Sequence, residues 1–255
     1  FRPPYAGTDH KPLHPLGYVR WDLLPSYPAP ASAPAAASVL RHVERPWIDH
    51  ILNWTLQHGC ATHNMYCYGR EIGDIVSEVA LYTLLDTPER ETLTIRFIQL
   101  GIDNAGIVAN GGRWPADGGH MNGRKWPVVF AGVMLDDAEM TSPGAVSGED
   151  DQTYIGADGE ALWGVACDSC FFENGCELGG ACNAGRQDCR DPEELVDGCY
   201  GYRNCCTSHT WVGEALAARL LPGAMDGWDH PALFDYVDRW MDGEVEDGGD
   251  AGSPF

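Results

Sequence analysis

Eight of the ten cysteines fall within forty residues, and no other feature limits the possible folds of the chain as much. An even number of cysteines in a stretch rich in Gly and Asp is typical of a disulfide framework made in an oxidising compartment. Zinc is the alternative, but Cys167 and Cys170 form one CxxC with no second CxxC at a suitable spacing, and adjacent Cys205-Cys206 fits a four-ligand site poorly. We therefore expect all ten cysteines to be oxidised: Cys60, Cys67, Cys167, Cys170, Cys176, Cys182, Cys189, Cys199, Cys205 and Cys206. The pairing stays open, because eight cysteines alone allow about 105 connectivities.

The start of the sequence agrees with this expectation of secretion. The first residue is Phe1, and no charged segment followed by an apolar segment precedes it. We expect that a signal peptide has been removed or that the sequence is part of a longer chain, and both fit a secreted, extracellular protein.

The charge of the chain argues against several classes of partner. The 255 residues include 38 Asp and Glu against 16 Lys and Arg, which gives a formal net charge of −22. A surface this acidic repels phosphate backbones and anionic lipids, so we expect neither nucleic acid nor membrane surfaces as partners. No apolar run reaches the 18 residues that a membrane-spanning helix needs.

The hydrophobic pattern predicts an all-α protein. Residues 1–45 are interrupted by prolines and are rich in Ala and Ser, which is typical of a stiff extended arm that wraps its own domain or a neighbouring subunit. Residues 46–242 form the main domain, within which residues 141–206 form an irregular disulfide-rich insertion, and residues 243–255 form an acidic tail. Helical periods predict helices at about 46–56, 69–85, 87–102, 125–136, 208–221 and 231–242, with no convincing strand. Such helices would form antiparallel hairpins.

One segment, residues 110–127, carries the densest set of chemical groups. Its five glycines permit close backbone approach, and between them stand His120 and Asp117. It also contributes three cations and two indoles, which are Arg113, Arg124, Lys125, Trp114 and Trp126. Indole faces stack on sugar rings, cations hold carboxylates or hydroxyls, and an imidazole transfers protons near neutral pH. The segment therefore predicts a carbohydrate-binding cleft, although a tight turn with local Arg and Trp packing is the alternative.

Two further clusters lie beside predicted helices. Asn64 and Tyr68 precede the helix at 69–85, and His209 and Trp211 follow the last cysteines. Polar groups at a helix entrance can face a pocket. The alternatives are that the tyrosine packs at a rim and that His209 is a capping or core residue.

Together these positions suggest a family resemblance. Helical hairpins with Asn64, Tyr68, His120, Arg124 and His209 at their loops resemble the α/α-toroid polysaccharide lyases and related glycosidases, over residues of about 46–240. The resemblance implies a partial α/α toroid in which Asn, His or Arg neutralises a uronate carboxylate. It also implies that a Tyr–His pair moves the protons of β-elimination.

The most direct interpretation is a secreted protein that cleaves a polysaccharide, by elimination rather than hydrolysis. Arg124 or Arg113 would hold the substrate carboxylate, His120 would take the neighbouring proton, and Tyr68 would protonate the leaving oxygen. Hydrolysis needs two carboxylates around the bond. Asp117 is the only one in the dense segment, so Glu71 or Asp103 would have to supply the second.

The alternative interpretation is a secreted structural or glycan-binding subunit without catalytic activity. A proline-rich arm that exchanges between copies would build a homo-oligomer, filament or lattice.

Calcium is a possible addition to either function. Glu149-Asp150-Asp151 and the residues Asp188, Asp191, Glu193 and Glu194 offer oxygen ligands, but neither run has EF-hand spacing. Solvated acidic loops are the simpler interpretation, and no metal site is predicted.

Overall fold

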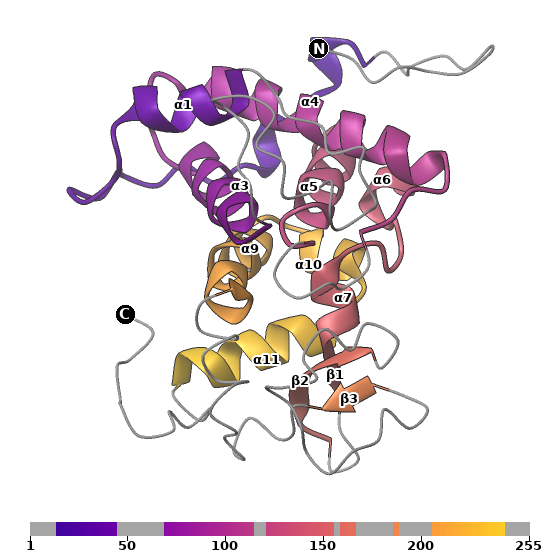
Figure 1. Ribbon diagram of the computed structural model, residues 1–255. Helices are drawn as coiled ribbons and strands as arrows, with labels where there is room; N and C mark the ends of the chain where they lie inside the picture. Colours follow the sequence, from indigo (N-terminus) through magenta and orange to yellow (C-terminus); the bar gives the residue numbers. More distant parts are fainter. Residues whose placement is uncertain are drawn as a thin grey trace.

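A computed structural model describes residues 14–44, 69–114, 121–155, 159–166, 186–188 and 206–242. These residues are mostly helical, as expected, and the helices lie in stacked layers with a small sheet at one end (Figure 1). Two short 3₁₀ turns, η1 (Leu16–Tyr18) and η2 (Trp21–Leu23), come first. The α-helices are α1 (Ala36–Glu44), α3 (Gly69–Thr83), α4 (Arg90–Ala109), α5 (Lys125–Leu135), α6 (Ala138–Thr141), α7 (Gly148–Gln152), α9 (Ser208–Leu220), α10 (Ala224–Trp228) and α11 (Pro231–Asp242). The strands are β1 (Thr153–Ile155), β2 (Ala161–Ala166) and β3 (Arg186–Asp188).

Helix α5 lies at the centre of the described core. All of its residues are buried, which suits a helix covered by other helices on every side. Phe130 meets Phe97 of α4 with the ring centroids 4.9 Å apart, and Trp126 stacks on Trp228 of α10 at 5.9 Å. The helix predicted at 125–136 is therefore confirmed, and its length follows from its uninterrupted apolar sequence.

Glycines set the spacing between the central helices. A Cβ atom on Gly101 of α4 would lie 2.0 Å from the carbonyl oxygen of Pro127 in α5. A Cβ atom on Gly132 of α5 would lie 2.1 Å from the backbone nitrogen of Thr141 in α6. Because neither backbone atom can move independently of its helix, only glycine permits these distances.

We expect Gly101→Ala to lower the free energy of unfolding by about 1–3 kcal/mol, the usual cost of overpacking a core. The added methyl group must push α4 away from α5. Urea denaturation followed by circular dichroism measures the change. Gly17→Ala is the matched control, because a Cβ atom there has no neighbour within 4 Å. Equal stability of the two variants would contradict the prediction.

Helices α3 and α9 form a second close pair, which positions the candidate site. Ser77 of α3 donates a hydrogen bond from its hydroxyl to the carbonyl oxygen of Thr210, at 3.1 Å. A Cβ atom on Gly213 of α9 would lie 2.5 Å from Cβ of Ser77. The predicted helices at 69–85, 208–221 and 231–242 are confirmed within a few residues, whereas the helix predicted at 87–102 begins at Arg90 and continues to Ala109.

The N-terminal segment lies against the body of its own chain. We call residues 14–35 the strap. Val19 and Leu24 are buried, and the backbone N–H of Arg20 donates to the carbonyl oxygen of Met134 at 2.9 Å. Tyr27 forms a parallel β-bridge with Leu85, in the turn between α3 and α4.

The prediction of an extended arm as far as residue 45 is wrong for its last part. Residues Ala36–Glu44 form helix α1, and Val39 and Val43, four residues apart, are buried on one face. Three consecutive alanines, Ala35 to Ala37, favour a helix once prolines no longer interrupt the chain. The prolines of the preceding residues made the whole segment resemble an extended arm, so the sequence did not predict this helix.

The region predicted as an irregular insertion contains regular structure, which corrects a second expectation. Strand β1 pairs with β2 in antiparallel register, with Thr153 opposite Trp163, and β2 pairs with β3, with Gly164 opposite Asp188. Strands of three to six residues are too short to show a clear alternation in sequence. The strands are stabilised by contacts with α11 rather than by their local sequence. One such contact is the hydrogen bond that Nη1 of Arg239 donates to the carbonyl oxygen of Ala161 at 2.8 Å.

Several predictions lie outside the described residues. These are the helix at 46–56, the acidic tail at 243–255 and nine of the ten cysteines. Cys206 is the exception, and it is buried. Among the helices of the described ranges, none has the length and apolarity needed to cross a membrane.

Candidate functional site: a buried cluster of polar residues

A short loop, residues 121–124, enters the body just before α5 and touches α3. Gly123 has φ +78°, and a Cβ atom on it would lie 2.9 Å from the backbone of Gly73. Two glycines therefore permit this contact. Asn122 donates from Nδ2 to the carbonyl oxygen of Cys206 at 3.0 Å, which joins the loop to the start of α9. The loop thus lies between two helices that are distant in sequence.

Glu149 of α7 reaches this loop from the other side. One carboxylate oxygen accepts a hydrogen bond from the backbone N–H of Gly123, and the other accepts one from the Ser147 hydroxyl. The side chain is fully buried. Burial raises the pKa of Glu149, and the two hydrogen bonds oppose the rise.

Glu214 of α9 is the most unusual group of the cluster, by which we mean Asp74, Asn122, Arg124, Glu149, His209 and Glu214. It is fully buried, and neither carboxyl oxygen has a hydrogen-bond partner among the described residues. Oε1 lies 3.4 Å from the position that a Cβ atom on Gly73 would occupy. Burial raises the pKa of Glu214 well above the ordinary value, the charges of Glu149 and Asp74 add to the rise, and Arg124 opposes it. We infer that this carboxyl group keeps its proton where ordinary glutamates are ionised.

The cluster reaches solvent at His209 and Asp74. Nε2 of His209 lies 3.8 Å from Oδ1 of Asp74, and the two side chains are 30% and 51% exposed. Burial raises the pKa of Asp74, His209 and Arg70 lower it, and Glu71 raises it. Arg70 and Glu71 lie in the first turn of α3 and form an ion pair at 2.9 Å. We call Arg70, Glu71, Asp74 and His209 the rim.

A buried ion pair stands beside the cluster. Nζ of Lys125 lies 2.6 Å from Oδ1 of Asp150, and both side chains are at most 1% exposed. Asp150 also accepts from the indole N–H of Trp228 at 3.3 Å and from the backbone N–H of Val146 at 2.9 Å. The pair fixes the start of α5 against α7 and α10.

The structure brings together only part of the predicted site. His209 and Arg124 both belong to the cluster, but Arg124 is 2% exposed. Three other predicted catalytic or binding residues that we expected near them, His120, Asp117 and Tyr68, lie outside the described residues, as does Asn64. Arg113 is exposed and donates to the carbonyl oxygen of Ala145.

Burial corrects the predicted role of the tryptophans and of Lys125. Trp114, Trp126 and Trp211 are each 0% exposed, so their indole faces pack in the core and are not presented to a sugar. Lys125 is held by Asp150 and does not reach the surface. A tryptophan suits both a core and a sugar cleft, and sequence alone does not distinguish the two.

Sequence reasoning missed Asp74 and Glu214 as candidate functional residues. The sequence does hold a signal for Glu214. Positions three, four and seven residues after Trp211 lie on the same buried face of α9, and Glu214 is the charged residue among them. Asp74 has no comparable signal, because its partner His209 lies in a distant helix.

Two of the acidic residues that could offer oxygen ligands to calcium, Glu149 and Asp150, are used within the protein. Glu149 and Asp150 accept hydrogen bonds from Gly123, Ser147, Lys125 and Trp228. Within the described ranges, no group of three or more His, Cys, Asp or Glu side chains is arranged to hold a metal ion.

Comparison of the chain with protein-family models, with curated proteins and with solved structures gives no significant match.

We expect Glu214→Gln to remove a loss of stability that the unmodified protein shows as pH rises. Below the ordinary carboxyl pKa, Glu214 is protonated in both the folded and the unfolded chain. Above it, only the unfolded chain releases the proton, so the folded state loses about 1.4 kcal/mol per pH unit until its raised pKa is reached. Glutamine carries no such proton.

Chemical denaturation at a series of pH values measures this difference. The two proteins should agree in acid and diverge towards neutral pH, with the variant the more stable. Glu139→Gln, at an exposed carboxylate, is the control and should follow the unmodified protein. Parallel curves for Glu214→Gln and the unmodified protein would show that Glu214 ionises normally.

Proposed function

We propose that the protein cleaves a polysaccharide by proton transfer at the rim of the cluster. The observation that carries the proposal is the pair of His209 and Asp74, which is partly exposed and stands in front of two fully buried carboxyl groups of raised pKa. Such perturbed groups gather at functional sites, because catalysis needs acids and bases that titrate near the working pH.

The exposure of the groups favours elimination over hydrolysis. Hydrolysis requires two carboxyl groups on either side of a glycosidic bond. Glu149 and Glu214 are fully buried and do not reach such a bond. Glu71 is paired with Arg70 at 2.9 Å, so Asp74, which is 51% exposed, is the principal carboxyl group that a substrate meets. Elimination requires instead a base, an acid and a cation near a uronate carboxylate, and the rim supplies one of each.

The roles follow from position and charge. His209 takes the proton from the carbon beside the uronate carboxylate, the bond to the leaving oxygen breaks, and a carbon–carbon double bond forms. Asp74, whose raised pKa favours the protonated form, returns a proton to that oxygen. Arg70, 38% exposed, takes the carboxylate-holding role predicted for Arg124, which is too deeply buried for it. The predicted contributions of His120 and Tyr68 stay hypotheses.

Glu214 is a positioning residue in this proposal. With its proton retained, it adds no negative charge behind a site that must accept an anionic sugar. An ionised carboxylate there would oppose substrate binding and would hold a proton on Asp74 more tightly.

Secretion, the disulfide framework and a partial α/α-toroid arrangement of the helices belong to the same proposal. A secreted enzyme would form its disulfides outside the cytoplasm. Mass measurement after alkylation without reductant tests the cysteines: full oxidation gives no labelled thiol, whereas several labelled thiols or stoichiometric zinc would overturn this part of the proposal.

A substrate screen tests the activity. The full chain is incubated with polygalacturonate, alginate and hyaluronan, and with neutral xylan and β-glucan. Elimination gives unsaturated ends that absorb ultraviolet light. New reducing ends without absorbance would show hydrolysis and overturn the proposed chemistry. If no polysaccharide gives a product and electron micrographs show ordered polymers, the proposal of an enzyme is wrong and the structural-subunit alternative takes its place.

A further inference from the structure

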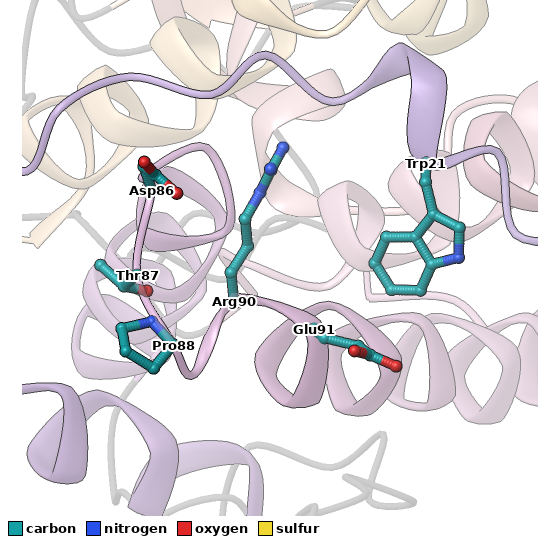
Figure 2. Close-up of a pocket in the computed structure, with 6 residues that line it drawn as sticks. All are labelled: Trp21, Asp86, Thr87, Pro88, Arg90 and Glu91. Carbon is teal, nitrogen blue, oxygen red and sulfur yellow. The ribbon is translucent and has the colours of Figure 1, made fainter.

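A pocket of about 450 Å³ lies between the strap and the turn that joins α3 to α4 (Figure 2). It is lined by Trp21, Asp86, Thr87, Pro88, Arg90 and Glu91. None of these residues belongs to the cluster. The pocket lies just beyond Thr83, the last residue of α3, whereas Asp74 lies in the first half of that helix. Asp74 and Thr83 are nine residues apart, or about 14 Å along the helix axis, so the two places are separate sites.

The walls of the pocket are held in place by the backbone. Arg90 donates from Nε to the carbonyl oxygen of Thr83 at 2.9 Å, and from Nη2 to the carbonyl oxygens of Leu24 and Pro25 at 2.9 and 2.6 Å. The backbone N–H of Asp86 donates to the carbonyl oxygen of Tyr27 at 2.7 Å. One side chain thus joins the strap to the turn and holds the two walls of the pocket together. The volume of the pocket is within the range of small-molecule sites.

The lining offers one flat apolar face and several polar groups. Trp21 is 37% exposed, and its indole stands on one side of the pocket (Figure 2). Asp86 and Glu91 contribute carboxylates. The Thr87 hydroxyl oxygen is buried and has no hydrogen-bond partner among the described residues. A buried hydroxyl without a partner costs free energy unless a ligand supplies one.

We propose that this pocket binds a neutral glycan. An indole face stacks on the apolar face of a sugar ring, while carboxylates accept hydrogen bonds from sugar hydroxyls. Thr87 would complete its hydrogen bonding with a further hydroxyl. Four of the six lining residues are polar, which suits a hydroxyl-rich ligand better than an apolar peptide.

Charge excludes the anionic glycans from this pocket. The lining contributes two carboxylates and one guanidinium group, which already donates to three carbonyl oxygens, and the whole chain carries a net charge of −22. A uronate or sulfate would meet net repulsion there. The proposal does not depend on cleavage at the rim, because the pocket shares no residue with it.

Affinity gel electrophoresis of the full chain tests the proposal. Gels contain a galactomannan, a mixed-linkage β-glucan or a xylan as neutral probes, and polygalacturonate as the anionic probe. We expect at least one neutral polysaccharide to retard the protein. Any retardation by polygalacturonate should be the same for Trp21→Ala as for the unmodified protein. Trp21→Ala should raise the Kd at least tenfold, and Glu91→Gln should raise it too.

Controls separate this site from the rim and from misfolding. Tyr18→Ala removes another exposed aromatic side chain of the strap, one that does not line the pocket, and should keep full retardation. His209→Ala should also keep it, so that binding is measured apart from cleavage. Absence of retardation by every neutral probe, retardation that survives Trp21→Ala, or binding of poly-proline in place of glycans would overturn the proposal.

Discussion

Replacing His209 by alanine is expected to reduce turnover of the polysaccharide roughly a hundredfold or more, the usual scale for losing a general base. The imidazole lies 3.8 Å from Asp74 at the exposed end of the cluster, where a substrate can reach it. The KM should change little if the imidazole acts mainly in the transition state. The rate of ultraviolet-absorbing product formation measures the effect.

The control for this prediction is a second histidine–carboxylate pair, whose carboxylate also belongs to α3. Nε2 of His42 lies 3.5 Å from Oε2 of Glu78, one turn further along α3 than Asp74. His42→Ala removes a comparable histidine–carboxylate contact without touching the rim, so turnover should remain near that of the unmodified protein. Equal losses in the two variants would mean that both histidines act through stability, and the catalytic role of His209 would be wrong.

Replacing Lys125 by methionine is expected to destabilise the fold by about 3–5 kcal/mol, the second large effect. The variant leaves the Asp150 carboxylate buried without its cation, and an uncompensated buried charge is costly. The lysine ammonium also lies 5.6 Å from the centroid of the Trp228 ring, and this contact is lost as well. Denaturation in urea measures the free energy of unfolding.

Two further variants show whether burial causes this cost. The double variant Lys125→Met and Asp150→Asn should recover part of the loss, because no unpaired charge remains. Arg20→Met breaks the partly exposed pair with Asp136, at 3.3 Å, and should cost no more than about 1 kcal/mol. A loss of that small size in Lys125→Met would contradict the prediction.

The sequence was sufficient for elements whose apolar residues repeat with a helical period. Helices α5, α9 and α11 were predicted within a few residues because each carries a continuous apolar stripe or run. Helix α1 was not predicted, because it follows a proline-rich stretch. The three strands were not predicted either, because each is too short to show a pattern and because the pairing of strands depends on distant parts of the chain.

The candidate site was harder to predict than the fold, for a physical reason. His209 was found because it follows two cysteines, but its partner Asp74 and the buried Glu214 depend on how α3 meets α9. Burial also decides between the two uses of tryptophan. Trp114, Trp126 and Trp211 were interpreted as sugar contacts, whereas exposed Trp21, on the strap, lines the pocket.

The stacking of Trp126 on Trp228 gives the molecule an optical reporter. The two rings lie 5.9 Å apart at an interplanar angle of 17°, close enough for their electronic transitions to couple. Trp228 also donates to Asp150, the acceptor of Lys125. Circular dichroism of the indole bands therefore follows the geometry around one buried ion pair, and any ligand or variant that shifts α10 against α5 changes that spectrum before the helices unfold.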